Sequence, residues 1–251
     1  MTEKQQITID GQLIDFEQGQ TVMDAAIAAN IYIPHLCHNP KFKPQGSCRL
    51  CTVNVNGRTA AACVTQCVAN AIVENQTIAL TAKRKDIIEL LFIEGNHFCP
   101  SCERSGDCQL QAQAYQHNMI GTELTYQYPS RQLDASHPEI MLDRDRCILC
   151  ELCVRASRDA DGKNVFAIAG RGNQANLVVN SDSGLLKDTQ LSVDDLAMKV
   201  CPVGALLIKK RGFNHPIGDR LYDHKPISEV GHHHPYETNQ DRKKDKLQED
   251  T

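Results

Sequence analysis

The chain has few of the features that mark nucleic-acid-binding, membrane or secreted proteins. Tryptophan is absent and aromatic residues make up only 5% of the 251 residues, so there is little surface on which bases could stack. The formal net charge of −4 argues against a nucleic-acid or anionic-membrane partner. No apolar run approaches the ~18 residues of a membrane span, and residues 1–11 lack the pattern of a signal peptide. We therefore expect a cytoplasmic protein.

Cysteine is the residue type that stands out. A reducing compartment does not favour a disulfide framework, so the 12 cysteines indicate metal binding. All of them except Cys67 fall, together with His97, into three groups of four. We name these groups tetrad 1 (Cys37, Cys48, Cys51 and Cys63), tetrad 2 (His97, Cys99, Cys102 and Cys108) and tetrad 3 (Cys147, Cys150, Cys153 and Cys201).

Tetrad 1 has the spacing of a [2Fe-2S] site. Ferredoxins place most ligands in one loop and take the last from a later segment. Gly46 lets backbone N–H groups approach the sulfurs, and such hydrogen bonds raise the reduction potential. Zinc is the alternative, but structural zinc usually uses paired Cys-x2-Cys knuckles, and only one is present here. Cys67 is an alternative to Cys63 as the fourth ligand, but the completeness of the three tetrads favours Cys63.

Tetrad 2 predicts a [4Fe-4S] site with one histidine ligand. Its three cysteines can bind three corners of the cluster, and His97 stands two residues from them, where a fourth ligand is needed. A neutral imidazole carries less negative charge than a thiolate, which raises the reduction potential. Zinc bound by three cysteines and a histidine is the alternative.

Tetrad 3 predicts a single [4Fe-4S] site. Cys147, Cys150 and Cys153 form the C-x2-C-x2-C run of bacterial ferredoxins. Two-cluster ferredoxins have a further cysteine four residues on, but this chain has Ser157 there. The distant Cys201, followed by a proline, therefore completes the site. A three-iron cluster is the alternative if one of the four does not bind.

The expected fold is α+β, in several small units. Residues 1–80 read as a β-grasp [2Fe-2S] ferredoxin domain, with strands at 7–9 and 13–16, a helix after Thr21 and a hairpin at Asn56-Gly57. Residues 81–120 read as a small helical domain, and residues 121–138 as a connector. Residues 139–211 read as a ferredoxin-like [4Fe-4S] domain with strands at 165–169 and 177–179 and a helix at 191–200. Residues 212–251 read as an extension that is largely disordered or partner-bound.

Four segments together resemble one family. They are Gly-Ser-Cys-Arg-Leu-Cys, Gly-Asn-His-Phe-Cys-Pro-Ser-Cys-Glu, Asp-Arg-Cys-Ile-Leu-Cys-Glu-Leu-Cys-Val-Arg and Cys-Pro-Val-Gly-Ala. The chain resembles the iron–sulfur diaphorase subunit of cytoplasmic NAD-reducing [NiFe] hydrogenases, itself similar to the N-terminal part of the large iron–sulfur subunit of complex I. Only Phe98 separates His97 from Cys99, as in the hydrogenase subunits, whereas complex I subunits usually have three residues there. The resemblance covers residues 7 to about 222.

The resemblance implies an electron-transfer subunit with no catalytic residue or substrate site of its own, in a hydrogen:NAD+ oxidoreductase. One [2Fe-2S] and two [4Fe-4S] clusters would carry electrons between a flavin subunit, which binds FMN and NAD(H), and the small and large subunits of a [NiFe] hydrogenase. We expect the β-grasp unit near the flavin partner and tetrad 3 near the hydrogenase partner. The alternatives are the same role in an NAD-dependent formate dehydrogenase or a complex I-like enzyme, a zinc-stabilised scaffold, and a stand-alone oxidoreductase.

Overall fold

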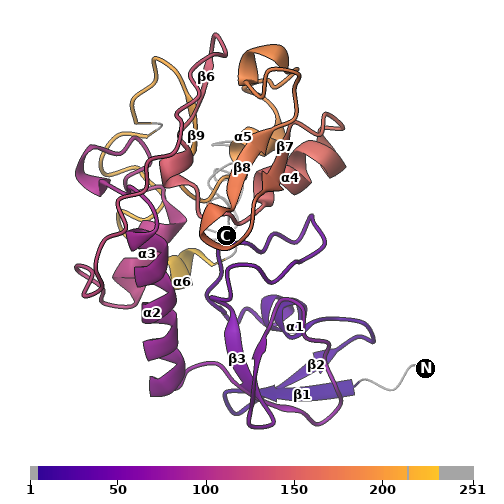
Figure 1. The fold of residues 1–251 in the computed structure, drawn as a ribbon. Helices are drawn as coiled ribbons and strands as arrows, with labels where there is room; N and C mark the ends of the chain where they lie inside the picture. The colour runs from indigo at the N-terminus through magenta and orange to yellow at the C-terminus, as the bar shows by residue number, and fades with distance from the viewer. Residues whose placement is uncertain (1–4, 214, 232–251) are drawn as a thin grey trace.

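The structure is a computed structural model that describes residues 5–213 and 215–231. The chain is mixed α and β, which confirms the expected fold class. A five-stranded sheet lies at one end of the molecule and two small two-stranded sheets lie at the other (Figure 1). Within the described residues, no helix is long and apolar enough to cross a membrane.

The five-stranded sheet belongs to the N-terminal unit, with strand order β2-β1-β5-β3-β4. Two of its turns, at Asp10-Gly11 and Asn56-Gly57, have positive φ at both residues, which is the geometry that tight hairpins require. Both hairpins were expected, but β5, which pairs in parallel with β1, was not. The strands are β1 (Gln5–Ile9), β2 (Gln12–Phe16), β3 (Thr52–Val55), β4 (Arg58–Ala61) and β5 (Ile72–Glu74).

Helix α1 (Val22–Ala28) covers this sheet. It begins with a complete capping box, in which Thr21 and Asp24 each accept a hydrogen bond from the other's backbone N–H. Its buried face packs with Ile7 and Ile9 of β1 into one apolar core. This core fixes the ends of the loop between α1 and β3, which carries three of the four tetrad 1 residues.

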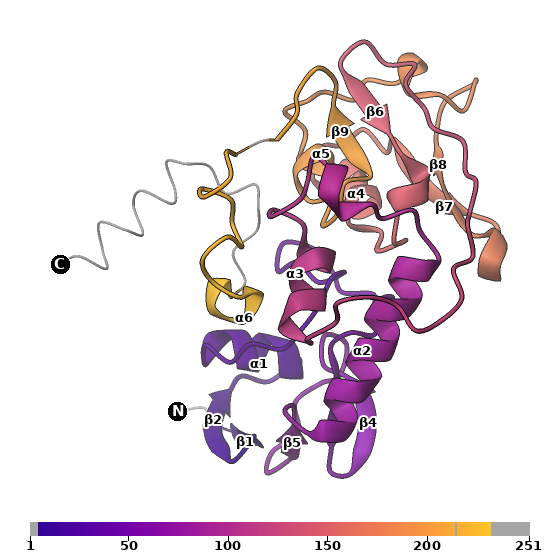
Figure 2. The same cartoon turned by 90° about the vertical axis from the view of Figure 1, so that its left-hand side faces the viewer.

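Helix α2 (Ile78–Ile93) connects the N-terminal unit to the rest of the molecule (Figure 2). It starts at the Thr77 N-cap, earlier than residue 81, because the Thr77 side chain accepts a hydrogen bond from the Leu80 N–H. The buried Arg84 holds the helix to the sheet by donating to the carbonyls of Thr52 and Asn75. Helix α3 (Gln109–Gln116) follows Cys108, as expected.

The C-terminal part is built around two antiparallel strand pairs, of which β7–β8 was expected and β6–β9 was not. The helix expected over 191–200 is wrong, because only α5 (Leu196–Lys199) forms. Its short N-terminus is fixed by the Asp161 carboxylate, which accepts the backbone N–H groups of Leu196 and Ala197. The other elements are β6 (Ile140–Leu142), α4 (Leu152–Arg155), a π-helical turn (Ala156–Ala160), β7 (Phe166–Ala169), β8 (Asn176–Val179) and β9 (Leu206–Ile208).

The extension after residue 212, expected to be largely disordered or partner-bound, packs against the rest of the chain over residues 215–231. Its described part includes α6 (Ile227–Val230), which packs against α3. The Ser228 hydroxyl donates to the side chain of Gln116 on that helix. The same expectation for residues 232–251 lies outside the described residues.

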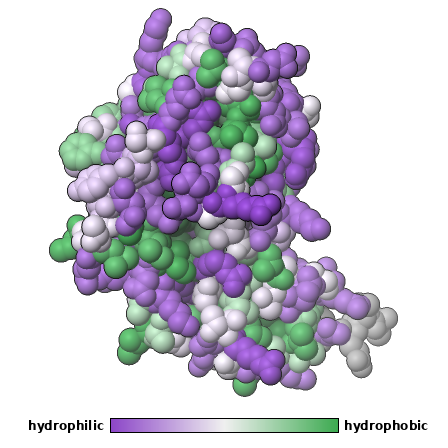
Figure 3. All heavy atoms as spheres, viewed as in Figure 1, coloured by the Kyte–Doolittle hydropathy of each residue, from purple (hydrophilic) through white to green (hydrophobic). Residues whose placement is uncertain are grey.

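The molecular surface is largely hydrophilic on the face drawn in Figure 3. Hydrophobic residues gather on the side where α2 and α3 lie (Figure 3). The exposed apolar side chains at α2 and in the segment after α3 include Ile78, Ile120 and Leu124. Exposed apolar surface of this kind is typical of an interaction site.

Candidate metal centres

Tetrad 1 is brought together by the loop between α1 and β3 and by the turn after β4. The Cys51 and Cys63 sulfurs lie 3.3 Å apart, and the Cys48 backbone N–H lies 3.5 Å from the Cys37 sulfur. Hydrogen bonds from the thiols of Cys48 and Cys63 hold the pKa of Cys37 far below its ordinary value. The four predicted residues of tetrad 1 therefore meet at one point in the structure.

Cys67 lies apart from these hydrogen bonds. Its backbone N–H donates to the Gln20 carbonyl, and its side chain packs against the core under the sheet. Burial raises the pKa of Cys67 to about 11, so the thiol stays protonated. These contacts fit a small core residue rather than a metal ligand.

Tetrad 2 lines a small, mostly enclosed cavity between α2, α3 and the loop from residue 97 to 108. All four tetrad residues line this cavity. Gly204, which follows tetrad 3 in sequence, approaches so closely that a Cβ there would lie 3.3 Å from the Cys102 sulfur. The backbone at Gly204 thus closes one side of the cavity, at a position where a side chain would crowd the Cys102 sulfur.

His97 has the environment of a metal ligand. Its Nε2 atom is buried and has no hydrogen-bond partner within the described residues. Burial, and then the nearby positive charge of Arg146, lower the pKa of His97 to about 4, so the ring is neutral. The Phe92 ring packs edge-on against it with centroids 5.4 Å apart. A buried, neutral imidazole with an unpaired nitrogen is suited to bind iron.

Tetrad 3 lines a second small cavity, in the C-terminal part. All four tetrad residues line it, and the other lining side chains are mainly aliphatic residues from β7, β8 and the residues around Cys201. Burial raises the pKa of Cys147 to about 11 and raises those of Cys150 and Cys153 further. Such thiols need a strong positive partner to ionise, which a cluster provides.

The backbone of the tetrad 3 loop is wound so that N–H groups point at the sulfurs. Leu149 and Glu151 have positive φ values of 52° and 59°. The backbone N–H of Leu149 forms a hydrogen bond that favours the thiolate of Cys147, which partly offsets the effect of burial. Residues with positive φ that alternate with residues of negative φ turn successive backbone N–H groups to one side, which creates a concave, anion-binding backbone. It suits a cluster that carries net negative charge.

Tetrad 3 adjoins tetrad 2 directly. Arg146, next to Cys147 in sequence, lies with its guanidinium 3.7 Å from the Cys102 sulfur and forms ion pairs with Glu103 and Asp143. The Gln109 N–H, one residue after Cys108, donates to the Pro202 carbonyl over 2.9 Å. Tetrad 3 also adjoins tetrad 1, because the Arg155 side chain donates to the carbonyls of both Cys37 and Cys150. Neither arginine was singled out from the sequence.

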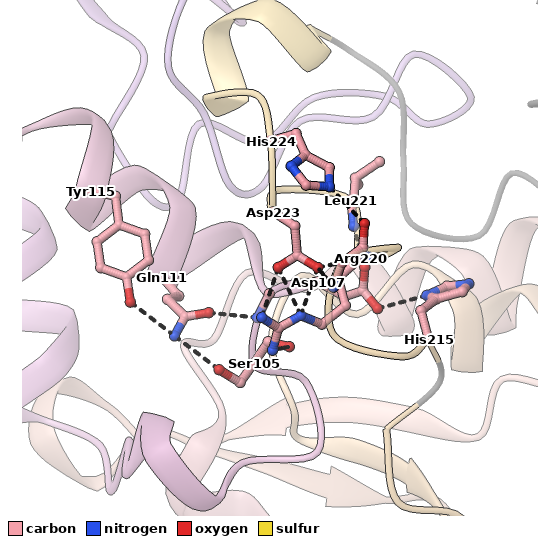
Figure 4. A network of polar contacts seen from close by, with 11 residues as sticks. Ser105, Asp107, Gln111, Tyr115, His215, Arg220, Leu221, Asp223 and His224 are labelled. Carbon is pink, nitrogen blue, oxygen red and sulfur yellow. Dashed lines mark hydrogen bonds and ion pairs between the residues drawn. The ribbon is translucent and has the colours of Figure 1, made fainter. Parts of the chain in front are cut away.

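The C-terminal extension clamps the loop of tetrad 2 (Figure 4). Asp107, which is buried and precedes Cys108, accepts hydrogen bonds from the Leu221 N–H and from His215 over 2.8 and 2.7 Å. Arg220 forms an ion pair with Asp223 and donates to the Ser105 carbonyl. The extension therefore stabilises the loop that carries Cys102 and Cys108.

The clamp makes a testable prediction for Asp107. Asp107→Ala removes the acceptor of both hydrogen bonds and leaves two half-buried donors, on His215 and Leu221, without that partner, which costs at most about 1–3 kcal/mol each. We expect faster proteolysis within residues 212–231 and faster loss of iron from one [4Fe-4S] cluster under air. Ser228→Ala, which removes an exposed hydrogen bond in the same extension, is the matched control. Unchanged proteolysis and iron retention would show that the clamp has no stabilising role.

The arrangement fits clusters better than single ions. The four residues of tetrad 2 line one cavity, and the four residues of tetrad 3 line another. The residues present therefore fit iron–sulfur clusters, which space their ligands around a larger core.

Family models match three consecutive parts of the chain. Residues 3–78 match the "2Fe-2S iron-sulfur cluster binding domain". Residues 84–121 match the "NADH-ubiquinone oxidoreductase-G iron-sulfur binding region", and residues 140–208 match the "4Fe-4S single cluster domain". Each matched part contains one tetrad, although Cys201 lies far from the other residues of its tetrad in sequence.

Curated relatives fall into two groups by length. An NADH-quinone oxidoreductase subunit of Streptomyces coelicolor is 33% identical over 80% of this chain, and the alpha subunit of the NADPH-Fe(3+) oxidoreductase of Geobacter sulfurreducens is 32% identical over 81%. The chain spans only 24% of the length of either relative. The gamma subunit of the NAD-reducing hydrogenase HoxS of Cupriavidus necator is 41% identical over 87% of this chain and 93% of its own length.

A solved structure gives the same result. A chain of an NAD+-reducing [NiFe]-hydrogenase, crystallised in the H2-reduced state, superposes with a TM-score of 0.87 at 50% identity. The match covers 89% of this chain and 95% of that one. The resemblance stated from the motifs is thus confirmed over nearly the whole described structure. The chain belongs to the family of the gamma subunits of NAD-reducing hydrogenases.

Proposed function

We propose that this chain is an electron-transfer subunit in which tetrad 1 holds a [2Fe-2S] cluster and tetrads 2 and 3 each hold a [4Fe-4S] cluster. The observation that carries the proposal is that each predicted set of four residues comes together at a separate, buried place in the fold. The unpaired His97 Nε2 and the buried thiols of tetrad 3 support it independently. When bound, such clusters accept and release one electron at a time.

The order of the clusters follows from the contacts between the tetrads. Tetrad 3 adjoins tetrad 2 through Arg146 and Gly204, and it adjoins tetrad 1 through Arg155. Electrons would therefore pass between tetrads 1 and 2 by way of tetrad 3. We therefore propose that tetrad 2, and not tetrad 3 as expected from the sequence, lies at the end of the wire near the hydrogenase partner.

The protein's contribution is to exclude water and to set the charge around each site. Aliphatic side chains line the tetrad 3 cavity, and backbone N–H groups point at its sulfurs. Tetrad 2 has a neutral imidazole in place of a thiolate and the guanidinium of Arg146 beside it. Both features of tetrad 2 favour the reduced cluster, so we expect tetrad 2 to have a higher potential than tetrad 3.

The partners follow from the chemistry that this chain lacks. Oxidation of NADH removes two electrons as a hydride, whereas each cluster transfers one, so a flavin on another subunit must separate the pair. We propose FMN and NAD(H) on that subunit, a Ni–Fe site on the hydrogenase subunits, and a cytoplasmic complex. The NAD-reducing hydrogenases among the chain's relatives support these partners.

A complex I-like NADH dehydrogenase is the second candidate. The identity to the NADH-quinone oxidoreductase subunit favours it, since that match extends over 80% of this chain. Two observations favour the hydrogenase: the single residue between His97 and Cys99, and the 93% coverage of the hydrogenase gamma subunit.

Anaerobic purification of the chain with its native partners tests the proposal. We expect iron in excess of about ten atoms per chain, two from the [2Fe-2S] and four from each [4Fe-4S] cluster, since partner iron adds to it. We also expect stoichiometric nickel. Iron with molybdenum and no nickel would indicate that the chain is the electron-transfer subunit of a formate dehydrogenase instead. Zinc without iron would contradict the electron-transfer proposal.

A further inference from the structure

Arg155 is the most deeply buried cation of the described chain, with 1% of its surface exposed. It ends α4, the short helix that begins immediately after Glu151 in the tetrad 3 loop. In the sequence it is the last residue of one of the four motif segments, but the cysteine pattern assigns it no role. Its position between two tetrads makes it the strongest unexplained feature of the fold.

The guanidinium joins the loops of tetrads 1 and 3. Its Nη2 atom donates to the Cys37 carbonyl over 2.6 Å and to the Cys150 carbonyl over 3.2 Å. Its Nη1 atom donates to the Lys43 carbonyl over 3.0 Å. A single planar group thus binds the backbone of one candidate ligand from each of these two tetrads. These residues, Cys37 and Cys150, lie 113 residues apart in the sequence.

Among the described residues, Arg155 forms no ion pair with a carboxylate, and its charge acts on the exposed Asp159 only through space. Its hydrogen-bond acceptors are backbone carbonyls, and the Phe42 ring lies 5.9 Å from Cζ. A buried charge is costly unless an opposite charge compensates it. Four thiolates around an iron–sulfur core leave net negative charge on each side of the guanidinium, and this charge increases on reduction.

We propose that Arg155 is a positioning residue shared by tetrads 1 and 3, whose fork fixes the distance between their two loops and whose positive charge favours reduction of both clusters. The inference rests on the proposed function, since it requires a cluster in each tetrad. It concerns how electrons pass between these two sites. Because one charge raises the reduction potentials of both clusters, the difference between the two potentials stays small. Because the guanidinium fixes the distance between the two loops, the rate of electron transfer between the clusters stays constant.

Two other buried arginines provide a contrast. Arg144 also donates to backbone carbonyls, but these belong to Leu177 and Gln132, and its charge lies beside Cys147 of tetrad 3. Arg84 holds α2 to the sheet near Cys51 of tetrad 1. Each therefore adjoins one tetrad, whereas Arg155 adjoins two. Arg144→Gln is the matched control for the loss of a buried cation beside tetrad 3.

The test is a redox titration of the intact complex, followed by electron paramagnetic resonance. The [2Fe-2S] and [4Fe-4S] clusters give different signals, and the two [4Fe-4S] clusters are told apart by the potentials at which they are reduced, that of tetrad 2 being the higher. In Arg155→Gln, we expect the ratio of reduced to oxidised cluster at a fixed solution potential to fall about tenfold for tetrads 1 and 3. A tenfold change equals about 59 mV for one electron. The signal of tetrad 2 should keep its potential. Arg144→Gln should shift tetrad 3 alone.

Arg155→Lys separates charge from geometry. Lysine retains the charge but lacks the fork that reaches two carbonyls at once. We expect potentials close to those of the wild type, with a changed magnetic interaction between the two reduced clusters because their spacing changes. If the complex with Arg155→Gln does not assemble, an unchanged magnetic interaction between the reduced clusters of tetrads 1 and 3 in Arg155→Lys overturns the proposal. A shift confined to tetrad 3 in Arg155→Gln also overturns it. Absence of cluster signals from the wild-type complex would instead overturn the proposed function.

Discussion

Replacing Cys150 with serine is expected to abolish hydrogen-driven reduction of NAD+ while NADH oxidation by an artificial dye continues. Cys150 is buried in tetrad 3, which adjoins both other tetrads. In the proposed wire, Cys150 is a ligand of the middle cluster, so loss of its thiolate would block electron transfer between the two ends. The dye would take electrons from the proposed flavin subunit, before tetrad 3. Both activities are measured spectrophotometrically on the purified complex.

The matched control for this change is Cys67→Ser. Cys67 is a cysteine of the same chain that lies outside all three tetrads, and its thiol is held protonated by burial. This variant should keep both activities near those of the wild type. Equal loss of the two activities in Cys150→Ser would mean that tetrad 3 does not lie between the flavin and the hydrogenase, or that the complex fails to assemble without it. Recovery of all subunits in the purified variant distinguishes these cases.

Replacing His97 with cysteine should lower the potential of one [4Fe-4S] cluster and leave the other two unchanged. The imidazole of His97 is neutral, because burial holds its pKa at about 4. A thiolate in its place adds negative charge at the cluster and disfavours the added electron. Exchange of histidine and cysteine ligands shifts iron–sulfur potentials on the order of 100 mV or more. A redox titration of the complex measures the shift.

His97→Ala is the companion variant for this prediction. It leaves the fourth iron of tetrad 2 without a protein ligand, so we expect a three-iron signal or loss of one iron. If both variants leave every potential and the iron content at wild-type values, His97 is not a ligand. In that case the buried, unpaired Nε2 would need another partner.

The grouping of the candidate ligands was predictable from the sequence because most of them lie in short motifs with characteristic spacing, although Cys201 lies far from the rest of its tetrad. The three tetrads, the β-grasp hairpins and α3 were predicted from short motifs, and the structure brings each tetrad together. The three-residue strand β5 carries too little periodicity to stand out. The helix expected over 191–200 failed because Asp161, 35 residues away from Leu196, decides where α5 begins.

The order of the tetrads could not be read from the chain. Sequence order places tetrad 2 in the middle, whereas the contacts of tetrad 3 with both other tetrads led us to propose tetrad 3 there. The contacts responsible are made by Arg146, Arg155 and Gly204, whose residue types have no distinctive spacing. The same applies to the clamp on Asp107, since the extension looked polar and unstructured from its composition alone. Long-range contacts of single side chains leave no periodic signal in a sequence.

The most direct test of the account is a Mössbauer spectrum of the full chain, purified anaerobically with enriched iron and combined with iron, sulfide and zinc determinations. The account predicts about ten irons per chain, of which roughly one fifth belong to a [2Fe-2S] cluster and the rest to [4Fe-4S] clusters. Stoichiometric zinc with little iron, or iron in a single type of cluster, would contradict the assignment of three clusters to three tetrads.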